Sequence, residues 1–382
     1  MRRFPPLRAV AAHGAIVLAA LVAACTEAPT RAPGPRPLTA AEGRALVSAH
    51  LPAKLGDRSG WATDIFAAMA SLRVDPTPQN VCAIVAITEQ ESGFEADPVV
   101  PNLGHIAERA LEQEREKAGI PSLVLDAALL LPSKDGRSYR ARIDAAHTER
   151  ELSDVFDDFI DRVPLGKRFL ADRNPVRTGG PMQVSVAYAQ AHAERKPYPY
   201  PVGDSLRHEV FSRRGGVYFG SAHLLDYPAD YPDMIYRFAD FNAGQYASRN
   251  AAFQKAVSGL SGVPLAYDGD LVRFEHGRIA EKPGSTELAV RVIAPRLGLD
   301  AAHIRRDLEH EQDYEFGRTE LYRAVFAEAD AEAGRRVPRA MLPRIDLSSP
   351  KFTRKLTTEG FARRVDRRYR ACLDRGQTTV KK

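Results

Sequence analysis

Two carboxylates close an apolar stretch in the segment ITEQESGF (87–94) of this 382-residue chain. A carboxyl group in an apolar setting has a raised pKa, which allows it to give up and take back a proton near neutral pH. Positions two apart on a helix point ~200° apart, so Glu89 and Glu91 cannot serve one site equally. Glu91 stands at the expected helix end, where a cleft can reach it, and is the candidate catalytic residue. Glu89 is expected to face solvent or to form an ion pair.

Two later segments bring amide groups and glycines that suit a sugar-binding cleft. They are GGPMQVS (179–185) and FADFNAG (238–244). Gln183 and Asn242 can bond sugar hydroxyls or N-acetyl groups, although either side chain can instead cap a local backbone group. Gly180 would let the backbone approach a sugar closely; the alternative is a simple turn.

In this order the three segments resemble the E-S pair, the G-L-M-Q turn and the A-Y-N-A-G motif of the lytic transglycosylases, enzymes of the lysozyme-like superfamily that cut peptidoglycan. The predicted helix GVYFGSAHLL (216–225) is similar to the family's G-x-x-Y-L helix, and the resemblance covers residues 77–257. It implies that one glutamate, Glu91, protonates the leaving oxygen and then accepts a proton from the substrate's C6 hydroxyl, which leaves a 1,6-anhydromuramoyl end. It also implies peptidoglycan glycan strands as the partner, no cofactor and no metal. The implied substrate-binding residues are Ser92, Gly180, Met182, Gln183, Tyr218, Asn242 and Gly244.

The chain also departs from the family pattern. A long interval of predicted helices, centred on residues 99–170, separates the first two motifs, where the family has a short loop. Pro181 replaces the usual leucine and Phe241 the usual tyrosine, so Tyr218 or Tyr246 would have to supply a cleft phenol. These departures favour a second hypothesis: a lysozyme-like lipoprotein that binds glycan or organises envelope partners without cutting.

Other catalytic templates do not fit the sequence. His310 and Glu311 are not followed by the second histidine of a zinc-protease helix, and the chain has no G-x-S-x-G, phosphate-binding loop or dinucleotide fingerprint. A hydrolase on the same fold would release reducing ends and would need a second carboxylate. Asp240 is the candidate for that role.

The N-terminal residues match the pattern of a lipoprotein export signal. Arg2 and Arg3 precede a short apolar run and a cysteine in the sequence VAAC (22–25). This pattern predicts a signal peptide over residues 1–24, lipidation of Cys25 and a proline-rich tether over 25–38. Thr26, rather than aspartate, follows the cysteine and favours the periplasmic face of the outer membrane. The alternative is a plain secretory signal.

Charge is unevenly distributed along the chain. The formal net charge of +5 falls when the basic signal peptide is removed, so no nucleic-acid partner is expected. Residues 351–382 are strongly basic and end in a helical pattern with one apolar face. Docking of this helix on the protein is the favoured interpretation, and contact with anionic lipid or the acidic wall is the alternative. Four aspartates at helical spacing are expected to form a solvated face: Asp154, Asp157, Asp158 and Asp161.

Two cysteines remain once Cys25 is lipidated. Cys82 lies in an apolar helical pattern and Cys372 in the basic tail. A disulfide is possible in an oxidising compartment. The apolar setting of Cys82 nevertheless favours a buried free thiol.

The hydrophobic periodicity predicts a mainly α protein. Thr39 and Glu42 form a capping-box pattern that begins the first helix. With the resemblance added, we expect a lysozyme-like helical domain over 39–262, with a large helical insertion at 99–170. A helical C-terminal region with a basic tail is expected over 263–382.

Overall fold

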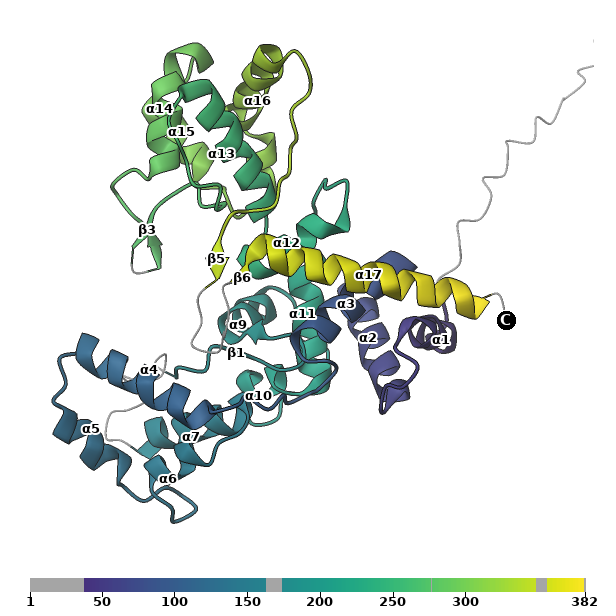
Figure 1. The fold of residues 1–382 in the computed structure, drawn as a ribbon, viewed down its shortest axis with the longest axis vertical. Helices are drawn as coiled ribbons and strands as arrows, with labels where there is room; N and C mark the ends of the chain where they lie inside the picture. The colour runs from purple at the N-terminus through teal and green to yellow at the C-terminus, as the bar shows by residue number, and fades with distance from the viewer. Residues whose placement is uncertain (1–37, 163–173, 276, 348–355, 381–382) are drawn as a thin grey trace, which may run out of the picture. The chain divides into compact units, whose positions relative to one another are not determined.

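The computed structural model describes residues 38–162, 174–275, 277–347 and 356–380 (Figure 1). The predicted signal peptide, Cys25 and nearly all of the tether lie outside these ranges. The described chain is mainly helical, which confirms the predicted class. Within the described ranges, no helix combines the length and the apolar character that crossing a membrane requires.

Helices alternate with short connections along the whole described chain. The capping box at Thr39 is confirmed, because its hydroxyl accepts from the Glu42 amide and the Glu42 carboxylate accepts from the Thr39 amide. The helices are α1 Ala40–His50, α2 Arg58–Leu72, α3 Pro78–Glu91, α4 Leu103–Lys117, α5 Ser122–Leu129, α6 Tyr139–Asp144, α7 Glu149–Arg162, α9 Val186–Arg195, α10 Leu206–Val210, α11 Arg213–Leu225, α12 Met234–Ala243, α13 Ala247–Ser261, α14 Ser285–Leu297, α15 Ala301–Leu308, the 3-10 helix η2 Tyr314–Arg318, α16 Glu320–Ala333 and α17 Thr358–Val380.

Strands occur only as three antiparallel pairs in the described ranges. The first pair carries the GGPMQVS segment. The pairs are β1 Thr178–Gly179 with β2 Val184–Ser185, β3 Phe274–Glu275 with β4 Arg278–Ile279, and β5 Asp346–Leu347 with β6 Leu356–Thr357.

A first hydrophobic core is built around α3. Residues 81–88 are all buried, because α1, α11 and α17 each pack against this helix. Thr77 caps its N-terminus and Pro78 occupies the first turn, where the missing amide of proline costs nothing. The core also takes in α2, α9 and α12.

A second hydrophobic core lies among α13, α14, α15 and α16. Phe253 on α13 stands at its centre, with ring centroids 5.1 Å from Phe316 and 6.0 Å from Tyr322. Helix α13 therefore belongs to the second core, although the sequence grouped it with the residues before 262.

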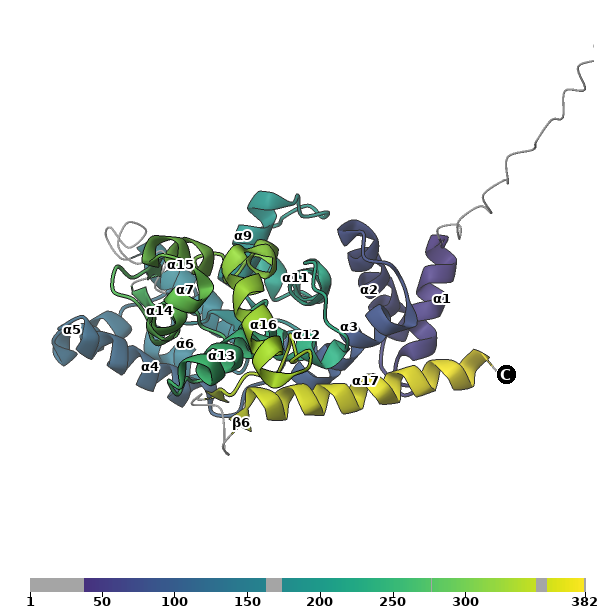
Figure 2. The same cartoon turned by 90° about the horizontal axis from the view of Figure 1, so that it is seen from above.

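The C-terminal helix returns to the first core. Helix α17 lies alongside α3 and α12 (Figure 1 and Figure 2). Phe361 and Val365 are buried there, which confirms the prediction that the basic helix docks on the protein.

The free-thiol prediction is wrong, because Cys82 on α3 and Cys372 on α17 form a disulfide. Their Cα atoms are 5.5 Å apart, a proximity that arises only when the two helices pack together.

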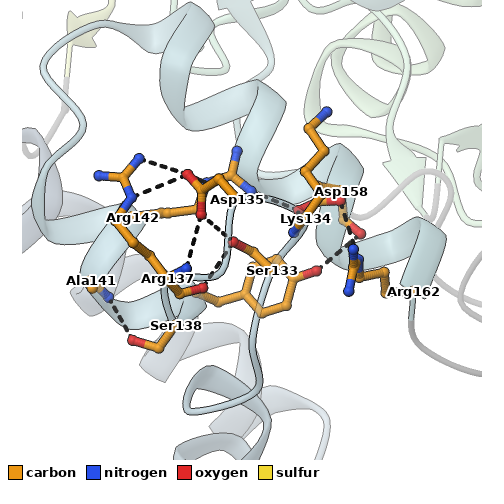
Figure 3. A network of polar contacts seen from close by, with 10 residues as sticks. Ser133, Lys134, Asp135, Arg137, Ser138, Ala141, Arg142, Asp158 and Arg162 are labelled. Atoms are coloured by element: carbon orange, nitrogen blue, oxygen red, sulfur yellow. Dashed lines mark hydrogen bonds and ion pairs between the residues drawn. The ribbon is translucent and has the colours of Figure 1, made fainter.

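The segment between α3 and β1 contains α4 to α7, as the predicted helical insertion requires. The aspartates of α7 are not simply a solvated face. Asp158 accepts from Arg142 at 2.6 Å and from the Lys134 amide at 3.2 Å (Figure 3). Asp154 bonds His208 at 2.7 Å. The face is polar because it binds neighbouring segments, which spacing alone cannot reveal.

Candidate functional site

The two glutamates of α3 lie on different faces, as helical geometry requires. Glu89 points to α17, with its carboxylate oxygens 3.9 Å from Arg368 and 3.7 Å from Arg375. Of the two alternatives expected for Glu89, solvent exposure or an ion pair, the structure shows the ion pair. Glu91 is the last residue of the helix and is half-buried. It therefore stands on another face, beyond a run of completely buried apolar residues.

The backbone reverses sharply just after Glu91. Ser92 ends α3, and its hydroxyl donates to the Thr88 carbonyl oxygen at 3.2 Å. Gly93 and Phe94 then both adopt positive φ, at 61° and 69°. Positive φ is uncommon for a bulky residue and is held only by strong surrounding contacts. Here the Phe94 ring is buried edge-on against Trp61, with centroids 5.2 Å apart.

The GGPMQVS segment forms the turn between β1 and β2. Gly180 has φ +73°, and an added Cβ would lie 2.1 Å from the Val210 carbonyl oxygen. Close packing therefore accounts for this glycine without a ligand. Gln183 also has positive φ, at 50°, and its amide donates to Glu149 at 3.0 Å.

Helix α11 holds the turn in place through its own glycines. An added Cβ at Gly216 would lie 2.4 Å from Pro181, and one at Gly220 would lie 2.4 Å from the Met182 sulfur. Met182 is fully buried. Pro181, which replaces the leucine of the lytic transglycosylase motif, thus packs directly against Gly216 of α11, where the absence of a side chain leaves room for the proline ring.

Tyr218 lies on the buried side of α11. It is 1% exposed, and its hydroxyl is 3.4 Å from Nε2 of His192. The Tyr198 ring packs against it at 5.2 Å. Tyr218 and Met182 therefore contribute to the core and offer a glycan no surface in this conformation.

The FADFNAG segment ends α12. Gly244 has φ +106° and stops the helix. Asn242 is exposed, and its amide oxygen accepts a hydrogen bond from the Thr358 hydroxyl at 2.9 Å. Gln183 and Asn242 are thus each engaged by a neighbour, one by α7 and the other by the start of α17.

Asp240 is a structural residue. Its buried carboxylate accepts from the Tyr231 hydroxyl at 2.6 Å, the Tyr227 hydroxyl at 3.2 Å, and the amides of Tyr246 at 3.0 Å and Ser248 at 2.7 Å. Burial raises the pKa of Asp240, and these hydrogen bonds oppose that rise. A carboxylate enclosed in this way cannot attack a sugar. Asp240 therefore cannot serve as the second carboxylate of a hydrolase.

His223 on α11 is the histidine nearest the FADFNAG segment. Its Nε2 lies 3.2 Å from the Phe241 carbonyl oxygen, while its buried Nδ1 has no hydrogen-bond partner. Burial lowers the pKa of His223 to about 4. The ring is therefore neutral at pH 7, with its proton on Nε2.

Glu149 is a buried acid beside Gln183 that sequence reasoning missed. It is buried at the start of α7, where the helix dipole favours a carboxylate. The segment that follows Glu91 contacts the residues just before Glu149. The Val100 amide donates to the His147 carbonyl oxygen at 2.9 Å, and the Asp97 carboxylate accepts from the Thr148 hydroxyl at 3.1 Å. The only sequence signal here is a capping-box pattern formed by Thr148 and Glu151, and such a pattern predicts a helix start and not a buried acid.

Fold and site together describe a mainly helical protein with two cores, whose motif-bearing segments meet on α11. Residues 54–375 match the model of a family described as "Protein of unknown function (DUF1615)". The chain belongs to this family, and the match includes the second core, the first core apart from α1 and its neighbour Leu51, and both cysteines of the disulfide. It is 49% identical over 328 residues to the uncharacterized protein YaiW of Escherichia coli K12, which covers 86% of this chain and 88% of that protein. No solved structure matched the chain.

Proposed function

We propose that this protein is a peptidoglycan lytic transglycosylase and that Glu91 is its single acid and base. The observation that carries the proposal is the position of Glu91 at the end of a buried apolar helix, followed by a strained reversal of the backbone. The packing of α3, β2 and α12 against α11 supports it further, because these elements hold the family-like segments.

The reaction needs one carboxyl group that acts twice. Protonated Glu91 donates to the glycosidic oxygen between MurNAc and GlcNAc as the bond to the anomeric carbon breaks. The carboxylate then accepts the proton of the C6 hydroxyl as that oxygen bonds to the same carbon. No water is consumed, and the product is 1,6-anhydroMurNAc.

Glu149 and Gln183 would form the opposite wall of the glycan site. The hydrogen bond between them fixes the orientation of the Gln183 amide. Both residues lie near the segment that leaves α3, through the contacts of Asp97 and Val100. Glu149 is also a better second carboxylate than Asp240 for a hydrolase on this fold, because Asp240 is enclosed by four donors.

The proposed anchor and location come from the sequence. Lipidation of Cys25 and the tether to residue 38 would hold the enzyme at the periplasmic face of the outer membrane, within reach of the wall. Metabolic labelling with a fatty acid tests this directly. The expected label is present in the wild type and absent in Cys25→Ala, and equal labelling of both contradicts the anchor.

The two glutamates of α3 provide a matched test of the catalytic proposal. Purified protein lacking residues 1–25 is incubated with sacculi, and soluble fragments are measured over time. Glu91→Gln is expected to lose activity by about 10³-fold, a typical contribution of a general acid. Glu89→Gln should retain activity. Equal loss in both variants, or none in Glu91→Gln, contradicts the assignment, provided that thermal unfolding shows each variant folded.

A second function is favoured by the contacts of Asn242 and Tyr218. The Asn242 oxygen is already bonded by Thr358, and Tyr218 is buried, so two family-like groups are not open to substrate. A protein that binds glycan without cutting it fits these contacts. Sedimentation with sacculi that is unchanged in Glu91→Gln, together with no soluble product from the wild type, selects this alternative.

A further inference from the structure

A small cavity in the second core has an unusual chemical lining. It encloses about 250 Å³ and is bordered by the loop before α12, the start of α13, η2, α16 and the chain after α16. Four arginines face it against a single carboxylate, that of Asp230. Its other polar lining is aromatic. The charged lining residues, with the two tyrosines that face the same space, are Asp230, Tyr246, Arg249, Arg318, Tyr322, Arg336 and Arg339.

Arg249 is the buried cation of this cavity. It is 6% exposed, and no carboxylate lies within ion-pair distance of it among the described residues. Its guanidinium donates to Asn250 at 3.0 Å and to the carbonyl oxygens of Asp313 at 2.7 Å and Glu311 at 2.6 Å. Arginine has five N–H donors, so two remain after these three bonds. Buried charges are normally paired, which makes this one an available partner for an anion.

The guanidinium is held rigidly, which prepares it for recognition. Its central carbon lies 4.3 Å from the Tyr246 ring centroid and 5.0 Å from that of Phe316. Tyr246 itself adopts positive φ, at 67°. A cation fixed between two rings loses little entropy when it binds a second group.

The other arginines differ in how far their charge is already compensated. Arg339 forms a two-point ion pair with Asp330, at 2.9 and 2.7 Å, and Arg318 lies 3.5 Å from Glu315. Arg336 is exposed and has no ion pair among the described residues. Arg249 and Arg336 are therefore the two arginines of the cavity that have no carboxylate at ion-pair distance among the described residues.

Two tyrosine hydroxyls are open to the same space. In the described ranges, neither Tyr246 nor Tyr322 has a hydrogen-bond partner for its hydroxyl, and neither oxygen is buried. Both can donate to an oxyanion. The Tyr314 hydroxyl, by contrast, is used by Asp230 at 3.0 Å. Asp230 would repel an anion on that side, so the ligand's charged group belongs near Arg249, Arg336 and Tyr322.

We propose that this cavity binds the oxyanion end of a small ligand, a carboxylate or a phosphate, through Arg249, Arg336 and the hydroxyls of Tyr246 and Tyr322. The volume suits a short ligand or the terminus of a longer one, since complete drug-sized sites are larger. This site is independent of Glu91, and its test does not use glycan cleavage.

Titration calorimetry with three probes separates the possible ligands. The probes are inorganic phosphate, the dipeptide alanyl-alanine with a free carboxylate, and its C-terminal amide. Saturable binding of phosphate or of the free dipeptide, with no binding of the amide, supports the site. The better binder of the two assigns the ligand to phosphate or carboxylate chemistry. Binding of the amide as tightly as the acid, or binding of none of the three, overturns the proposal.

Neighbouring arginines supply the matched control. Arg336→Gln and Tyr322→Phe should each weaken binding of the preferred probe by tenfold or more. Arg335→Gln removes the same charge from an exposed residue that lines a different cavity, and it should leave the affinity within twofold. Equal losses in Arg335→Gln and Arg336→Gln would show attraction by general charge only and would overturn the site. Among the described residues, Arg335 and Arg336 form no ion pair and the Tyr322 hydroxyl has no hydrogen-bond partner, so each variant is expected to remain folded.

Discussion

Helix α3 at the centre of the first core differs from the second core in where it places charge. In the first core, residues 81–87 of α3 are all buried and apolar, and the two carboxylates of that helix, Glu89 and Glu91, stand at its end. The second core buries charge: Glu287 is completely enclosed and accepts from Arg291 and Arg305, each at 2.6 Å. The acids of α3 thus stand at the rim of the first core, where chemistry can reach them, whereas the buried Asp240 of α12 is enclosed by hydrogen-bond donors. In the second core, the ion pairs of Glu287 join residues of α14 and α15 and thereby hold these two helices together.

The largest stability effect should come from breaking the buried ion network of the second core. Glu287→Leu leaves Arg291 and Arg305 without their shared partner, and loss of one member of a buried pair costs about 3–5 kcal/mol. Urea denaturation should show a correspondingly lower free energy of unfolding. Glu275→Leu, which removes an exposed carboxylate paired with Arg273, serves as the control and should change it by less than about 1 kcal/mol. Equal effects would remove the distinction between the cores.

The first core should depend on its disulfide instead. Cys82 and Cys372 close a loop of 290 residues, and a disulfide of this kind stabilises by about 2–4 kcal/mol. Protein lacking residues 1–25 has only these two cysteines, so adding a reductant tests the bond cleanly. The urea midpoint should fall on reduction and should not respond to reductant in Cys82→Ala/Cys372→Ala. An unchanged midpoint for the wild type would mean that α17 docks equally well without the bond.

Acid should weaken the first core through His223. Burial lowers its pKa from 6.5 to about 4. Between these two pH values the unfolded chain therefore binds a proton at His223, whereas the folded chain keeps the ring neutral. The stabilisation from keeping this ring neutral is complete above pH 6.5 and is lost as the pH falls toward 4, by about 3 kcal/mol at most. His223→Gln keeps a donor for the Phe241 carbonyl and cannot titrate. The free-energy gap between wild type and variant should therefore shift between pH 7.5 and 4.5; a constant gap contradicts the burial of His223.

The smallest of these effects concerns the GGPMQVS turn where it meets the end of α10. Gly180→Ala forces a Cβ against the Val210 carbonyl at positive φ, and should destabilise by about 1–3 kcal/mol. Gly259→Ala, on α13 with open space around it, is the control and should be neutral or slightly stabilising. A neutral Gly180→Ala would show that the turn does not pack closely against the end of α10, and close packing would then no longer account for this glycine.

Sequence reasoning succeeded where the cause is local. Helical periodicity separated Glu89 from Glu91, and the Thr39 capping box located the first helix. It failed where the cause is a contact between distant segments. The disulfide depends on α17 reaching α3, and the Asn242–Thr358 bond joins residues 116 positions apart. Burial of Glu149 follows from the packing of the insertion, which no spacing in the sequence encodes.

The most direct test of the central claim is the chemical identity of the product. Sacculi digested by the protein lacking residues 1–25 are analysed by mass spectrometry of the soluble fragments. The account predicts 1,6-anhydromuramoyl ends, each lighter than a reducing end by one water molecule, from the wild type and from Glu89→Gln but not from Glu91→Gln. Reducing ends from the wild type, or anhydro ends that persist in Glu91→Gln, would contradict it.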